Sequence, residues 1–134
     1  MKALKILLTC VALCGCLASC TTDPDDLGPA YVENLRIIEE GDGFIRIGWD
    51  LPDNYQTVDR WQIMRSYEGQ KVRNEDEYII GYVTKSTTEY VDYDVKIGYT
   101  YQYSVSAMRG HAIYGGRGYN DPMIYYTGGT YRYD

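Results

Sequence analysis

The sequence predicts an all-β domain, a sandwich of about seven strands, and three observations support this prediction. From residue 31 onward, short runs rich in Ile, Val, Thr, Tyr and Trp are separated by Gly, Asp, Asn and Pro at intervals of about ten residues. In the clearest runs apolar and polar residues alternate, which is typical of a strand with one buried face. No run in this region shows the apolar spacing of an amphipathic helix.

The first two strands are expected at residues 31–39 and 44–50, joined as a hairpin. Between them stands Asp42-Gly43, a pair that suits a tight turn requiring positive φ. Each run has an apolar face made by alternate residues, and Pro52 ends the second run. The apolar residues are Leu35 and Ile37 in the first run and Ile45, Ile47 and Trp49 in the second.

The remaining strands follow the same reasoning. They are expected at residues 60–66, 78–83, 87–92, 98–108 and 121–127. In the run 60–66, Trp61 and Ile63 share a face. In the run 98–108 two sets of residues alternate, one expected to point inward and the other to point out to solvent. The inward set is Tyr101, Tyr103, Val105 and Ala107, and the outward set is Gln102, Ser104 and Ser106.

Three segments carry a family resemblance: "IRIGWDLP" with Trp49, "WQIMRS" at 61–66, and "TEYVDYDVKIGYTYQYSVSAM" at 88–108. Together, in this order and spacing, they resemble a fibronectin type III domain, particularly the bacterial kind, over about residues 29 to 127. The resemblance implies a seven-stranded immunoglobulin-like β-sandwich of fibronectin type III type. It also implies a structural role for Asp92, a turn glycine at Gly98 and a corner tyrosine at Tyr101, whose hydroxyl returns to the backbone.

The resemblance places two further residues. Val95 takes the position of a leucine in the corner, and Ile97 stands where proline is usual. We expect Trp49, Trp61 and Tyr101 to belong to the structural core.

The N-terminus predicts export and anchoring. Residues 1–19 carry Lys2 and Lys5 ahead of an apolar run, as in a signal peptide. Leu17-Ala18-Ser19-Cys20 resembles the bacterial lipoprotein box, which implies a lipidated Cys20 that holds the protein in the membrane. An ordinary signal peptide with a cysteine at its end is the alternative.

Residues 20–30 are then expected to form a lipidated cysteine and a polar tether. Thr21 is more typical of an outer-membrane lipoprotein than of one retained in the inner membrane. The acidic cluster at 23–26 is similar to export signals of Bacteroidetes-type surface lipoproteins, with solvated linker charge as the alternative. We expect an envelope lipoprotein of the outer membrane, with surface exposure left open.

Cysteine content and charge narrow the function. All four cysteines lie in the first twenty residues, so after cleavage only Cys20 remains and no disulfide can form within the chain. Loss of the two leader lysines leaves a net charge of −8. A field of this sign disfavours nucleic acids and anionic lipid surfaces as partners.

Catalysis is not expected. His111 is the single histidine, and no cysteine nucleophile survives in the mature chain. The carboxylates at 39–42, 75–77 and 92–94 are explained by turns and surface solvation, so we expect no metal and no cofactor.

The segment 109–122 is the candidate recognition loop, because it combines arginine and aromatic side chains with flexible glycines. A hairpin tip with solvated tyrosines is the alternative. The candidate binding residues are Arg109, His111, Tyr114, Arg117 and Tyr119.

The predicted domain therefore covers residues 31–127, followed by a tyrosine-rich C-terminal tail at 128–134. We expect a noncatalytic binding or spacer module for a protein or glycan at the cell surface. The alternative is a structural subunit or anchor of a surface assembly, joined by strand addition through the tail.

Overall fold

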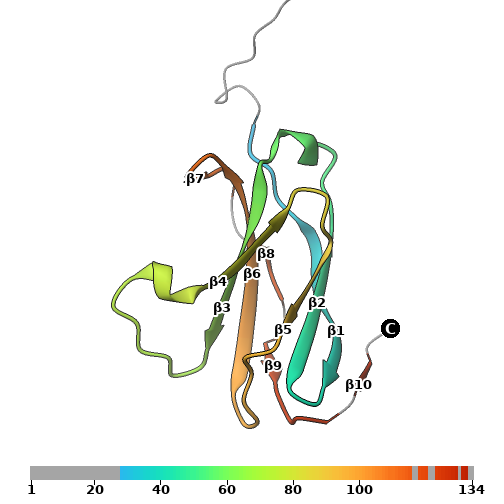
Figure 1. Cartoon of the computed structure of the whole chain (residues 1–134), viewed down its shortest axis with the longest axis vertical. Helices are drawn as coiled ribbons and strands as arrows, with labels where there is room; N and C mark the ends of the chain where they lie inside the picture. The colour runs from blue at the N-terminus through green and yellow to red at the C-terminus, as the bar shows by residue number, and fades with distance from the viewer. Residues whose placement is uncertain (1–27, 116–117, 121–122, 130, 133–134) are drawn as a thin grey trace, which may run out of the picture.

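The computed structural model of the chain describes residues 28–115, 118–120, 123–129 and 131–132, which form two packed antiparallel sheets (Figure 1). The first sheet, in the order β10-β1-β2-β5, contains β1 (Glu33–Gly41), β2 (Phe44–Asp50), β5 (Glu89–Asp92) and β10 (Tyr131–Arg132). The second sheet, in the order β4-β3-β6-β7, contains β3 (Arg60–Tyr67), β4 (Ile79–Thr84), β6 (Thr100–Arg109) and β7 (Ala112–Ile113). Two more strands, β8 (Gly118–Tyr119) and β9 (Ile124–Tyr125), also pair with β6.

This arrangement confirms the predicted all-β sandwich. The six strands β1 to β6 correspond to the first six predicted runs. The last run, predicted at 121–127, contributes only β9, whereas β8 forms inside the predicted loop and extends the same edge of β6. Short 3-10 helices at Tyr55–Thr57 and Glu75–Tyr78 lie in connecting segments.

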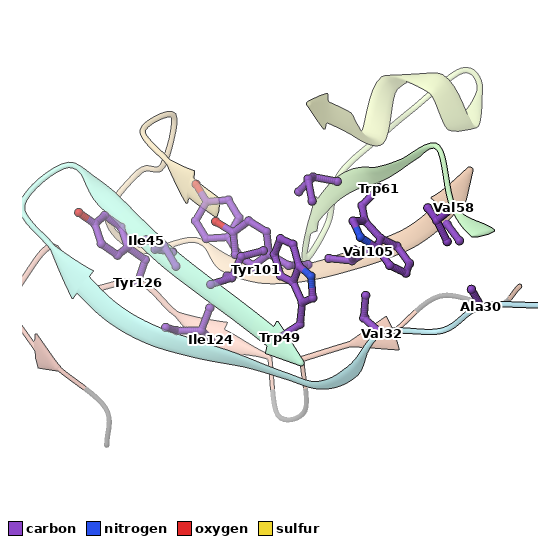
Figure 2. Close-up of a cluster of buried hydrophobic side chains, with 14 residues drawn as sticks. Ala30, Val32, Ile45, Trp49, Val58, Trp61, Tyr101, Val105, Ile124 and Tyr126 are labelled. Atoms are coloured by element: carbon purple, nitrogen blue, oxygen red, sulfur yellow. The ribbon is translucent and has the colours of Figure 1, made fainter. Parts of the chain in front are cut away.

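The space between the sheets is filled by the alternating apolar residues. Trp49 of β2, Trp61 of β3 and Tyr101 of β6 point into it (Figure 2), and each is at most 2% exposed. The indole N–H of Trp61 donates to the carbonyl oxygen of Lys85 at 2.9 Å, so this buried donor is satisfied. The same cluster includes Ile45, Ile47, Val58, Ile63, Tyr103, Val105, Ala107 and Ile124.

The β1–β2 hairpin turns at Asp42-Gly43, where Gly43 has φ +83°. A buried tyrosine from the last strand region fixes this turn. The hydroxyl of Tyr126 donates to the carbonyl oxygen of Gly41 at 2.5 Å and accepts from the amide of Gly43 at 2.7 Å. Tyr126 therefore connects the C-terminal part of the domain to its first hairpin.

The alternation in β6 holds, but the solvent exposure expected for Ser104 and Ser106 is wrong. Both serines are buried, and Gln102 is half-buried. Because β6 is an interior strand, Ser104 lies between Met64 of β3 and Tyr119 of β8. The larger side chains of Met64 and Tyr119 cover the small side chain of Ser104.

Both ends of the described chain are fixed to the domain. The amide of Ala30 donates to the carbonyl oxygen of Tyr114 at 3.2 Å, and Ala30 is buried, so the tether predicted at 20–30 is wrong at this residue. At the other end, β10 adds to the free edge of β1, so part of the predicted tail pairs with its own sheet. None of the helices in the described ranges is long and apolar enough to cross a membrane.

Trp49→Ala should reduce the free energy of unfolding by about 3 to 5 kcal/mol, because the substitution empties the centre of the core. Urea denaturation measures this change. Tyr31→Ala, at a half-exposed position, is the matched control and should cost less than about 0.5 kcal/mol. A loss below about 1 kcal/mol for Trp49→Ala would contradict the register of β2.

Candidate functional site

The predicted recognition loop begins at Arg109, and this residue belongs to the framework. Its Nε donates to the carbonyl oxygen of Thr57 at 2.8 Å, and its Nη2 donates to Oγ1 of the same threonine at 2.5 Å. The guanidinium also lies 4.8 Å from the centre of the Tyr114 ring. Since the side chain is buried, Arg109 holds the loop against the 3-10 turn and is not offered to a ligand.

The other described loop residues differ in their exposure. His111 is exposed, whereas Tyr114 is half-buried and its carbonyl accepts from the amide of Ala30. Tyr119 is half-exposed on β8, beside a hollow of about 150 Å³ on the outer face of the second sheet. Arg117 lies outside the described residues.

A buried carboxylate connects the two sheets. Asp92, at the end of β5, is 4% exposed. Arg65 on β3 donates from Nη1 to both of its oxygens, at 3.0 and 2.9 Å. The hydroxyl of Tyr103 on β6 donates to Oδ2 at 2.6 Å, and the amide of Asp94 donates to Oδ1 at 3.1 Å. Because β5 belongs to the first sheet and β3 and β6 to the second, the bonds from Arg65 and Tyr103 cross the interface, whereas the Asp94 bond is local.

The network fixes the protonation states of its members. Burial, followed by the charge and the hydrogen bond of Asp92, raises the pKa of the Tyr103 hydroxyl far above its ordinary value. Burial alone would lower the pKa of Arg65, but the hydrogen bond and charge of Asp92 outweigh it, and the net shift is upward. Tyr103 therefore stays a neutral donor and Arg65 stays a cation.

The segment after β5 has the geometry implied for a corner. The hydroxyl of Tyr101 accepts a hydrogen bond from the backbone amide of Lys96 at 2.8 Å. Gly98 has φ +90°, a conformation that favours glycine. Val95 packs against the core, whereas Ile97 is largely exposed. This corner holds the residues that follow Asp92 beside the second sheet.

A groove opens next to the network, between the start of β4 and the end of β5, with a volume of about 550 Å³. We call it the Arg65 groove. Its side chains include Arg65, Glu77, Tyr90, Asp92, Tyr93 and Asp94. A smaller hollow of about 70 Å³ shares Arg65 and Asp94 and is bounded by Tyr67, Lys96, Tyr99 and Tyr101. Arginine, carboxylate and aromatic side chains are thus concentrated at this end of the domain.

The acidic runs serve mainly in ion pairs and turns. Glu39 pairs with Arg46 at 3.2 Å, and Glu77 lies 3.5 Å from Arg73. Within the part of the chain that the structure describes, no three His, Cys, Asp or Glu side chains gather in a way that could hold a metal ion.

Arg65 was not selected from the sequence, although a signal was present. The alternation that places Trp61 and Ile63 inward places Arg65 on the same face. A charged residue at an inward position requires a partner of opposite charge. The resemblance to fibronectin type III domains implies a structural role for Asp92. The two observations together indicate an Arg65–Asp92 ion pair.

Comparisons with known proteins agree on the fold. No family model and no curated protein matches the sequence, whereas 104 chains of solved structures match. The FN5 domain of Drosophila Lar is 18% identical, with 75% of this chain and 99% of that chain covered and a TM-score of 0.55. Domains A168–A170 of titin are 12% identical, with 72% and 32% covered and a TM-score of 0.55. Domains d3–d4 of rat CD45 are 14% identical, with 72% and 50% covered and a TM-score of 0.52.

Identities this low show the fold alone. The described domain is an all-β sandwich of fibronectin type III type, as its strand order and corner tyrosine indicate.

Tyr103→Phe should make stability less sensitive to alkaline pH. Above pH 10 the unfolded chain loses the Tyr103 proton while the folded chain keeps it, so wild-type stability falls as pH rises. The variant lacks this contribution, and its free energy of unfolding should fall between pH 10 and 11 by about 1 kcal/mol less than that of wild type. Urea denaturation at both pH values measures the difference, with Tyr31→Phe as the matched control. Parallel pH profiles for wild type and Tyr103→Phe would contradict the buried network.

Proposed function

We propose that this protein is an outer-membrane lipoprotein, anchored by acyl chains on Cys20, that displays a noncatalytic binding or spacer module for a protein or glycan at the cell surface. The observation that carries the proposal is the order of parts: a lipobox-like Leu17-Ala18-Ser19-Cys20, a short acidic linker, and one sandwich domain. Domains of this fold are typically noncatalytic, which supports binding or spacing over turnover.

The proposed anchor gives the domain an orientation. Gly28 is eight residues from Cys20, so at about 3.5 Å per residue the linker spans at most about 28 Å. The chain enters the sandwich at the end where Ala30 meets Tyr114, which is also the end of the 110–115 turn (Figure 1). The Arg65 groove lies toward the opposite end and would face away from the membrane.

The recognition loop contributes to the proposal through its exposed residues. His111 and Tyr119 could contact a partner, while Arg109 would support the loop from beneath through Thr57. A partner that contacts His111 would have to approach between the domain and the membrane, whereas Tyr119 lies at mid-length of β6, opposite Ser104.

Assembly by strand addition is a second candidate, favoured by one observation. Residues 131–132 already form a strand, β10, on the edge of β1. The same segment could add to a neighbouring chain if it left its own sheet. Since β10 pairs with β1 of its own chain over only two residues, exchange between chains would break few hydrogen bonds.

Cys20→Ala should move the protein from the membrane fraction to the soluble fraction and abolish incorporation of labelled palmitate, because the lipid attachment site is lost. Fractionation with immunodetection measures the first effect. Cys10→Ala, within the leader, is the matched control and should leave both unchanged. Palmitate incorporation that persists in Cys20→Ala would contradict the proposed anchor. The palmitate measurement also distinguishes lipidation from retention of the protein in the membrane by an uncleaved leader.

A further inference from the structure

We propose that the Arg65 groove is a saccharide-binding site. The proposal deepens the binding function proposed above, on which it rests, by naming a site outside the recognition loop and the chemical class of its ligand. It depends on four features of the groove: a fixed donor, a paired acceptor, an exposed aromatic ring and the absence of surplus positive charge.

The donor is the outer edge of the Arg65 guanidinium. Nη1 is occupied by the carboxylate of Asp92 and by the carbonyl oxygen of Asp94 at 2.9 Å. Within the described ranges, Nη2 and Nε donate no hydrogen bond, and Nη2 lies 3.6 Å from the Asp94 carboxylate. A guanidinium held on one edge by a buried carboxylate presents its other edge in a fixed position.

The acceptor is the side chain of Asp94, which is 84% exposed beside that edge. A hydroxyl group can accept from Nη2 and donate to a carboxylate oxygen at the same time. Two hydroxyls on neighbouring carbons of a sugar ring can divide these roles. One accepts from Nη2 of Arg65, and the other donates to the Asp94 carboxylate, whose oxygen lies 3.6 Å from Nη2. Arg65 and Asp94 therefore fit a polyol better than a ligand with donors alone or acceptors alone.

The aromatic contribution comes from Tyr93. Tyr93 is 76% exposed at the groove, tilted against Phe44 with ring centres 6.1 Å apart. Tyr99 borders the adjoining hollow, but its ring is stacked on Tyr101 at 6.0 Å and has Lys96 Nζ 6.0 Å from its centre, so it is not counted as a sugar-binding ring. The faces of aromatic rings carry negative partial charge and attract the C–H hydrogens of a sugar ring. The Phe44 ring beside Tyr93 limits the movement of this tyrosine, which lowers the entropy lost on binding.

The charges of the groove argue against anionic ligands. Arg65 and Lys96 stand beside Glu77, Asp92 and Asp94, so the site has no surplus of positive charge to bind phosphate or sulfate. Among the described residues, no three His, Cys, Asp or Glu side chains gather in a way that could hold a metal ion. A neutral, hydroxyl-rich ligand needs neither surplus positive charge nor such a cluster.

The test is titration of the full-length lipoprotein, purified in detergent, with neutral oligosaccharides of defined linkage. The probes are maltohexaose, cellohexaose, xylohexaose and mannohexaose. Isothermal titration calorimetry measures the affinity of each. We expect at least one of them to bind. Tyr93→Ala and Asp94→Asn should each weaken that binding at least about tenfold, because both side chains are exposed and serve the ligand instead of the fold. Tyr31→Ala is the matched control, since this exposed tyrosine is at the other end of the domain, and it should change affinity by less than about twofold.

Two outcomes would overturn the proposal. One is the failure of all four oligosaccharides to bind. The other is binding that Tyr93→Ala and Asp94→Asn leave intact but His111→Ala abolishes, which would place recognition in the loop. Neither outcome changes the fractionation of Cys20→Ala, so failure of the groove is distinguishable from failure of the anchored-module proposal.

Discussion

The carboxylate of Asp92 is the polar contact on which much of the sandwich depends. It is buried at the end of β5 and receives hydrogen bonds from Arg65 and Tyr103 on two strands of the facing sheet. A buried charge without such partners would cost several kcal/mol, so the three side chains must take their positions together. The apolar core supplies most of the stabilisation, and this network specifies how the sheets are aligned.

The same network has consequences at the surface. Nη1 of the Arg65 guanidinium serves Asp92, and its Nη2 lies 3.6 Å from the carboxylate of the exposed Asp94, which lines the groove. The corner bond between Tyr101 and the Lys96 amide holds the connecting segment nearby. A rigid interior therefore positions the exposed side chains of a proposed ligand site, at the end of the domain remote from residue 28. The loop at the opposite end is instead held to the framework through Arg109.

The sequence predicted what depends on local pattern and could not predict what depends on distant contacts. Alternation identified the buried faces of β2, β3 and β6, because each side chain's face follows from its position in the strand. The burial of Arg109 depends on Thr57, 52 residues earlier, and no local pattern reveals that contact. Tyr126 was one of several tyrosines near the C-terminus, and only its contact with the first hairpin distinguishes it. The groove arises where β4 and β5, from different sheets, approach each other.

The most direct test of this account is a double-mutant cycle between Arg65 and Asp92, measured by urea denaturation. The variants are Arg65→Met, Asp92→Asn and the two combined. Each single substitution leaves its partner with a buried, unmatched polar group, whereas the double variant removes both members of the pair. The account predicts a coupling free energy of about 1 to 3 kcal/mol, with the double variant less destabilised than the sum of the two singles. Additivity within about 0.5 kcal/mol would contradict the claim that this contact aligns the sheets.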